Sequence, residues 1–250
     1  MGELCYWTFE IFGMLYEQII THSAGRLTTA ADSSIGGQEM DEGIIVPARS
    51  KNASAWRRLL REWINLINQY STPDNGEIDV PYWYGERALT GLLSAAAWKL
   101  KEGWALEEFT AERGTEGGSI SGRGDLWCGM GDIVFTIEAK IHWPERDIDS
   151  AIQGTKGKLA AANKQLQSLA KDYRQGDPYS VCYVVPWPRR ESIQPELHEV
   201  LALLNQVAER FASEKCIVAK YSFDASFPED NGRVYPGVVL VAREEKWVTV

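Results

Sequence analysis

The sequence predicts an α/β protein with a mixed central β-sheet flanked by helices. Two observations predict this class. Helical patterns alternate with strand-like runs along the chain, and residues 179–187 form a fully apolar run typical of a strand buried on both faces. The chain has 250 residues, of which 44% are hydrophobic and 11% aromatic. This composition supplies a packed hydrophobic core and excludes a chain that is disordered as a whole.

Helices are expected in the first third of the chain. Residues 4–20 are apolar and aromatic and are predicted as a helix, and a long polar loop over 22–50 follows. Residues 53–70 place tryptophan, leucine and isoleucine at helical spacing, so a second helix is expected there, with Ser54 as its N-cap. The two apolar helices are also candidate interfaces for a homodimer or a partner subunit.

A third helix and a hairpin are expected next. The helix runs over 82–102, and Gly103 is placed to end it. Residues 105–112 either extend this helix or begin the first strand. The runs 119–128 and 133–141 are strand-like and are joined by a short glycine-containing link, which predicts a β-hairpin.

The rest of the chain alternates helices with strands. A basic helix with a thin apolar stripe is expected over 151–174, and a strongly amphipathic helix over 195–212. Further strands are expected at 216–223, 238–243 and 247–250. The expected organisation is an N-terminal helical elaboration followed by an α/β core, at residues 1–78 and 79–250.

The distribution of charge limits the expected partners. The net charge of −9 argues against non-specific coating of nucleic acid. Residues 151–190, however, carry seven basic and two acidic side chains. A basic segment on an acidic body is consistent with a local phosphate-binding face or with an ordinary solvated helix face.

Neither a membrane span, a secretory signal nor a structural zinc site is expected. No apolar run approaches the roughly 18–20 residues of a membrane helix, and the first twenty residues contain three glutamates and no lysine or arginine. The four cysteines lie far apart without a CxxC pair, and the chain has only three histidines. Free thiols in a reducing cytoplasm are the expected state.

Three charged residues of the predicted hairpin carry the chemistry. Glu138 and Lys140 are two residues apart on one strand, so their side chains share a face, and Asp125 lies roughly opposite on the partner strand. Two carboxylates that meet beside apolar strands are costly unless a cation compensates them. Mg²⁺ is a natural compensation, because it takes carboxylates, waters and phosphate oxygens. The alternative is a turn-forming Asp125 and an exposed Glu138–Lys140 pair.

This pattern resembles the PD-(D/E)xK nuclease superfamily, which has the restriction-endonuclease-like fold. The motif has an acidic residue on one strand and (D/E)-x-K on the next, matched here by Asp125 and by Glu138-Ala139-Lys140. A preceding helix often bears a glutamate that is a further metal ligand, and Glu86 has that place. A basic or glutamine-bearing helix often follows, with Gln165 as the candidate. The residue before Asp125 departs from the motif, because it is glycine and not proline.

The resemblance implies a metal-dependent nuclease that hydrolyses phosphodiester bonds. Asp125, Glu138 and Glu86 would hold Mg²⁺, which Mn²⁺ can replace, with the carbonyl of Ala139 assisting, and Lys140 would position the attacking water. DNA is expected over RNA because most relatives cut DNA, and a role in defence against foreign DNA or in phage and mobile-element biology is expected by analogy. The candidate phosphate contacts are Arg123, Lys156, Lys158 and Lys164.

Two alternative functions remain open from the sequence. The first is a catalytically inactive module of the same fold that binds nucleic acid or protein within a larger complex. The second is a metal-independent glycan hydrolase, in which Asp125 and Glu138 act as an acid–base pair roughly 5–10 Å apart. Metal binding separates the nuclease from the first alternative, and insensitivity to EDTA would favour the second.

Overall fold

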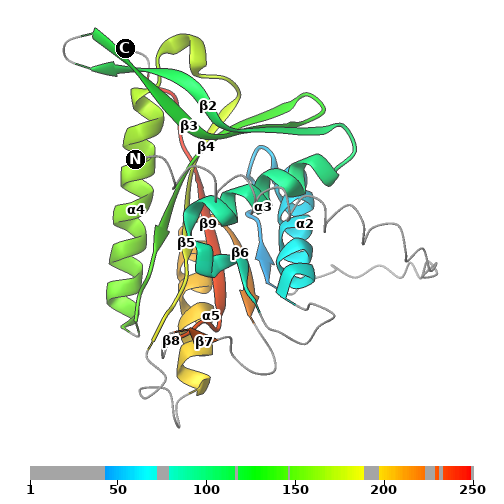
Figure 1. Cartoon of the computed structure of the whole chain (residues 1–250), viewed down its shortest axis with the longest axis vertical. Coiled ribbons are helices and arrows are strands. Elements are labelled where there is room, and N and C mark those ends of the chain that lie inside the picture. The colour runs from blue at the N-terminus through cyan, green and yellow to red at the C-terminus, as the bar shows by residue number, and fades with distance from the viewer. Residues whose placement is uncertain are drawn as a thin grey trace, which may run out of the picture. The chain divides into compact units, whose positions relative to one another are not determined.

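The computed structural model describes residues 43–71, 79–115, 118–145, 147–188, 197–222, 229–230 and 233–248. Residues 40–250 form one compact unit around a seven-stranded sheet (Figure 1). The predicted helix at 4–20 and residues 22–42 of the predicted loop over 22–50 lie outside the described residues, and residues 44–45 of that loop form a short strand. The strands lie side by side in the order β1 (Ile44–Ile45), β6 (Ile217–Ser222), β9 (Gly237–Glu244), β5 (Asp177–Val184), β4 (Ile133–His142), β3 (Gly118–Met130) and β2 (Gly103–Thr115).

The sheet is mixed, as the sequence predicts. Strands β4 and β5 are parallel, and every other neighbouring pair is antiparallel. A parallel pair needs a crossover, which is supplied here by helix α4 (Ile148–Ser168). A separate two-stranded ribbon joins β7 (Glu229–Asp230) to β8 (Arg233–Val234). The α/β class with a mixed sheet flanked by helices is therefore confirmed.

Helices cover both faces of the sheet (Figure 1). Helices α2 (Ala53–Ser71) and α3 (Glu86–Lys99) pack on one face, and α4 and α5 (Leu197–Ser213) pack on the other. Strand β5 serves both cores, because Tyr179, Val181 and Tyr183 alternate with Cys182 and Val184. This two-sided burial explains its fully apolar sequence. None of the described helices is long and apolar enough to span a membrane.

Helix α2 forms over the predicted residues and packs its aromatic stripe on the sheet. Trp56 is fully buried and stacks on Phe135, with ring centroids 5.2 Å apart. Trp63 is also fully buried and donates its indole N–H to the carbonyl of Leu89 on α3. The apolar stripe that suggested an interface is therefore used within the core. Ser54 lies inside the helix and is not its N-cap.

The third predicted helix is divided in two. A short 3₁₀ helix, η1 (Pro81–Tyr84), precedes α3, and Gly85 separates them with a φ of +90°. This φ is unfavourable for residues with a Cβ atom, so the glycine makes the break. The chain leaves α3 after Lys99, and residues 103–115 form strand β2. The ambiguous segment 105–112 is thus a strand.

Two further expectations are corrected. The predicted helix over 151–174 ends at Ser168, because the next residues turn to β2, where the N–H of Ala170 donates to the carbonyl of Glu112. A 3₁₀ turn, η2 (Lys171–Tyr173), follows. Residues 247–248 of the last predicted strand lie outside the sheet, since the N–H of Val248 donates to the Gln167 side chain and not to a neighbouring strand.

Candidate functional site

The predicted hairpin has the register that the motif requires. Strands β3 and β4 pair from Met130↔Ile133 to Leu126↔Ile137, and the turn lies at residues 131–132. Asp125 is the next residue of β3 and Glu138 the next residue of β4, so they face each other just beyond the last pair of the β3–β4 ladder. The pairing between these two strands ends there, which leaves room for side chains beside β4.

Beyond the last β3–β4 pair, acidic side chains accept hydrogen bonds from backbone N–H groups of β4. The backbone N–H of Ala139 donates to Asp125 Oδ2 at 2.8 Å. The backbone N–H of Ile141 bonds to the carboxylate of Glu86, an interaction that favours the charged form of that carboxylate. Because a buried strand N–H needs an acceptor, these two carboxylates are fixed by the open edge of β4.

Helix α3 brings Glu86 to this edge from its first residue. Gly85 sets the direction of the chain into the helix, and Thr90 Oγ1 donates to the Glu86 carbonyl at 2.9 Å and lies 3.4 Å from the hydroxyl of Tyr183 on β5. Burial raises the pKa of Glu86. The charge of Lys140 lowers this pKa, and the charge of Asp125 raises it. The glutamate predicted from its place in the sequence therefore lies in the cluster.

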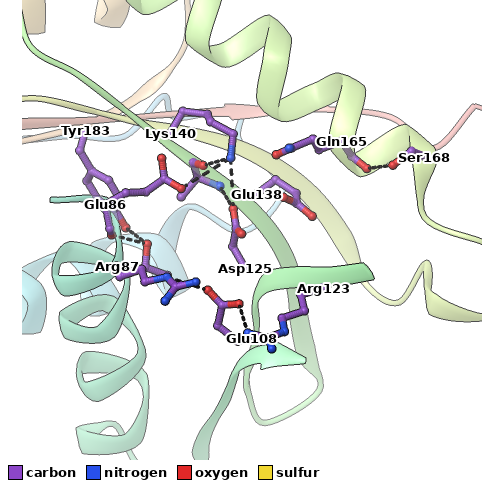
Figure 2. A network of polar contacts seen from close by, with 12 residues as sticks. Glu86, Arg87, Glu108, Arg123, Asp125, Glu138, Lys140, Gln165, Ser168 and Tyr183 are labelled. Atoms are coloured by element: carbon purple, nitrogen blue, oxygen red, sulfur yellow. Dashed lines mark hydrogen bonds and ion pairs between the residues drawn. The ribbon is translucent and has the colours of Figure 1, made fainter. Parts of the chain in front are cut away.

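Lys140 lies between two carboxylates, as Figure 2 shows. Its Nζ is 3.6 Å from Glu86 Oε1 and 3.6 Å from Asp125 Oδ2, and it donates to the carbonyl of Ala139 at 2.5 Å. The Lys140 side chain is 20% exposed, so a water molecule can reach the ammonium group. The lysine is thus held where a water beside the carboxylates could be oriented.

Glu138 is the most buried member of the cluster. Its side chain is only 1% exposed, and Oε1 pairs with Arg113 at 2.6 Å. Burial, together with the neighbouring Asp125, raises the pKa of Glu138 to about 8, although Arg113 acts in the opposite direction. The second oxygen, Oε2, is buried without a hydrogen-bond partner in the protein. A buried unpartnered carboxylate oxygen is costly and calls for a ligand.

The residues present are compatible with Mg²⁺. No three acidic, histidine or cysteine side chains among the described residues form a complete metal-binding group in this conformation. Mg²⁺ does not require one, because it commonly uses one or two carboxylates and keeps several waters. Asp125 and the free oxygen of Glu138 provide such a pair, and the Ala139 carbonyl is close by but accepts from Lys140.

Sequence reasoning missed Arg113, which comes from β2 and contacts Glu138. The alternation of inward-facing and outward-facing residues along β2 was the available signal. Its odd-numbered positions face inward, since Ala105 and Ala111 are buried, and Arg113 is the next odd-numbered position. This pattern was not usable while the segment could also be a helix. The arginine reaches Glu138 only because β2 follows β3 beyond the point where β3 leaves β4.

A second basic group lies beside the cluster. Glu108 on β2 pairs with Arg87 of α3 at 3.2 Å and with Arg123 of β3 at 3.3 Å (Figure 2). The two arginines are 72% and 66% exposed, so both remain accessible to a ligand. Arg123 was predicted as a phosphate contact, whereas Arg87 and Glu108 were not. Two exposed guanidinium groups at the mouth of the cluster form a phosphate-compatible surface.

The predicted contacts on α4 have different surroundings. Gln165 points its side chain toward Lys140 in Figure 2, and its carbonyl accepts from Arg113. Lys156 donates to Glu214 at the end of α5, a partner outside the cluster. Lys158 and Lys164 are exposed on the same helix. Of these four residues, the structure places Gln165 at the cluster.

Comparison with known proteins gives no assignment. No protein family model matches the chain, and no significant match is found among curated proteins or among solved structures.

Proposed function

We propose that this chain is a metal-dependent nuclease of the PD-(D/E)xK type, with a restriction-endonuclease-like core, that hydrolyses phosphodiester bonds. One observation carries the proposal. Asp125 and Glu138 meet at the open edge of a hairpin, Lys140 contacts the first of them, and a buried oxygen of Glu138 has no partner. A divalent cation would satisfy that oxygen and compensate the two adjacent carboxylates.

Each residue of the cluster has a role in this proposal. Asp125 and Glu138 would hold Mg²⁺, with Glu86 and the Ala139 carbonyl as further oxygen donors. When bound, the cation supplies Lewis-acid polarisation of the phosphate. Lys140 would orient the attacking water with a hydrogen bond from its ammonium group and stabilise the hydroxide formed when that water loses its proton to solvent. The half-buried position of Lys140 limits the exchange of that water with bulk solvent.

The surface beside the cluster favours a phosphate backbone as substrate. Arg87 and Arg123 lie next to the carboxylates and present exposed guanidinium groups. Arginine binds phosphate oxygens through paired hydrogen bonds, which positions a strand without reading its sequence. DNA over RNA remains the expectation that the resemblance provides.

The test is cleavage of linear, circular and single-stranded DNA and of RNA, with Mg²⁺, with Mn²⁺ and with EDTA. We expect metal-dependent cutting that falls by at least about 100-fold in Lys140→Ala, the lower end of the usual contribution of general acid–base catalysis. Lys220→Ala is a matched control, because Lys220 is also a strand lysine, bonded to Asn205 outside the cluster. Metal-independent cutting, or equal activity of Lys140→Ala and Lys220→Ala, would contradict the proposal.

A second candidate is an inactive module that binds nucleic acid or protein within a larger complex. The observation in its favour is that Lys140 and Arg113 already contact all three carboxylates of the cluster. Calorimetry separates the two candidates, since the inactive module would bind neither Mg²⁺ nor Mn²⁺. The glycan hydrolase fits less well, because the carboxyl groups of Asp125 and Glu138 are close neighbours, near enough for Asp125 to raise the pKa of Glu138, and not separated by the roughly 5–9.5 Å that glycosidases use.

A further inference from the structure

Arg113 is bound more completely than an ordinary surface arginine. One terminal nitrogen, Nη1, donates to the carbonyl of Gln165 at 2.7 Å and to Ser168 Oγ at 3.0 Å. The other, Nη2, donates to Glu138 Oε1 at 2.6 Å and to the carbonyl of Arg123. These four bonds use all four N–H groups of the two terminal nitrogens. The guanidinium is therefore fixed by β3, β4 and α4 together.

The backbone beside Arg113 is fixed as well. The neighbouring Glu112 accepts from the N–H of Ala170, and Arg113 itself forms an isolated bridge with Leu169, just beyond the end of α4. The Arg113 side chain is only 15% exposed. Its bond to Glu138 therefore comes from a rigid framework and not from a mobile side chain that settles on the nearest carboxylate.

This framework fixes the orientation of the Glu138 carboxyl group. With Oε1 bound to Arg113, rotation of the carboxyl group would break a 2.6 Å ion pair inside the protein. The other oxygen, Oε2, is thereby left as the buried atom without a partner, in a carboxyl group that also contacts Asp125. A carboxylate that binds a metal through one oxygen is commonly held by a hydrogen bond to the other.

We propose that Arg113 is a positioning residue that presents Glu138 Oε2 to the divalent cation and keeps Oε1 out of the coordination sphere. This inference rests on the proposed function and adds to it a residue from outside the motif. It makes the metal site depend on β2, a strand that carries none of the acidic ligands. The opposing interpretation is that Arg113 substitutes for the metal and must leave before the metal binds.

The test measures metal affinity directly, by calorimetry with Mg²⁺ and by the electron paramagnetic resonance spectrum of bound Mn²⁺. The variants are Arg113→Lys, which keeps the charge but loses the forked geometry, and Arg113→Met, which loses both. Arg174→Met is the matched control, because Arg174 also donates to carbonyls at the end of α4, those of Leu169 and Gln167, without touching the cluster. Circular dichroism and urea unfolding establish that each variant is folded.

Both Arg113 variants are expected to bind Mn²⁺ about 10- to 100-fold more weakly than the wild type, as is usual when a residue supporting a metal ligand is lost. Arg174→Met is expected to bind as the wild type does. An affinity equal to or tighter than that of the wild type in either Arg113 variant would overturn the inference, and tighter binding by Arg113→Met would favour the substitute role. If the wild type binds no metal at all, the proposed function fails first.

Discussion

Replacement of Glu138 by glutamine should change how the stability of the metal-free protein depends on pH. Glutamine keeps an oxygen for Arg113 but cannot ionise. Burial, with the neighbouring Asp125, raises the pKa of Glu138 from 4.5 to about 8. A carboxyl group with a raised pKa contributes stability that is present below its unfolded value and is lost as pH rises through its folded value. As the pH rises from about 4.5 to about 8, the wild type should therefore lose stability relative to Glu138→Gln.

The size of the effect follows from the shift. Each pKa unit corresponds to about 1.36 kcal/mol, so the shift from 4.5 to about 8 sets an upper limit of about 5 kcal/mol. Between about pH 5 and about pH 9, some 4 kcal/mol of this should be lost in the wild type and not in the variant. The Glu138 side chain is 1% exposed, so solvent screening does not reduce this figure much.

The assay is urea unfolding of both proteins in EDTA at the two pH values. The free energies of unfolding should be similar at the acidic end, with Glu138→Gln the more stable at the alkaline end. Glu245→Gln is the matched control, because it removes another largely buried carboxylate bonded to an arginine, Arg243, outside the cluster. A difference between wild type and Glu138→Gln that stays constant with pH would refute the reasoning.

Added Mg²⁺ provides a second arm of the same experiment. A cation that binds the ionised carboxylate stabilises the folded wild type, by about 2.7 kcal/mol at a concentration of 100 times its dissociation constant. At the alkaline end, Mg²⁺ should therefore reduce the advantage of Glu138→Gln. An advantage that Mg²⁺ does not change would leave the pKa argument intact but count against a metal ligand at Glu138.

Two further predictions concern the neighbours of the cluster. A Cβ atom at Gly124 would lie 2.1 Å from Cζ of Phe109. Gly124→Ala should therefore lower the free energy of unfolding, measured by urea, by about 1–3 kcal/mol, and by less in a Phe109→Ala background. An equal cost in both backgrounds would contradict the packing argument. Arg87→Ala and Arg123→Ala should each weaken DNA binding to a similar extent for all DNA sequences. Each should also reduce the slope of log affinity against log salt concentration by about one, measured by titrations at several salt concentrations. An unchanged slope would show that the substituted arginine does not contact phosphate.

The features that could be predicted from sequence are those set by neighbouring residues. The helical spacing of tryptophan and leucine was enough to predict α2, because its apolar stripe is continuous along one segment. The facing positions of Asp125 and Glu138 followed from the hairpin, since the turn at 131–132 lies midway between them. The apolar run at 179–187 predicted the buried strand β5 for the same local reason.

The features that could not be predicted depend on distant contacts. Strand β1 exists because Ile44 pairs with Ala219, a partner far away in sequence. The contact of Arg113 with Glu138 spans 25 residues, and its contact with Ser168 spans 55. Residues 247–248 have a strand-like composition but bond to the end of α4 and to the residues before β5, where Trp247 Nε1 donates to the Gly176 carbonyl.

The site itself arises from a break in regular structure that composition does not reveal. Glu108 on β2 lies in the β2–β3 register opposite Asp125, between the pairs Glu107↔Leu126 and Phe109↔Gly124, and has a φ of +47° that is uncommon for a residue with a side chain. At the same rung, β3 stops pairing with β4. Unfavourable backbone conformations of this kind concentrate at functional sites. If β3 continued along β4, its backbone would accept the hydrogen bond that the Ala139 N–H now donates to Asp125. The motif supplies the acidic residues, and the departure of β3 gives them the space in which they meet.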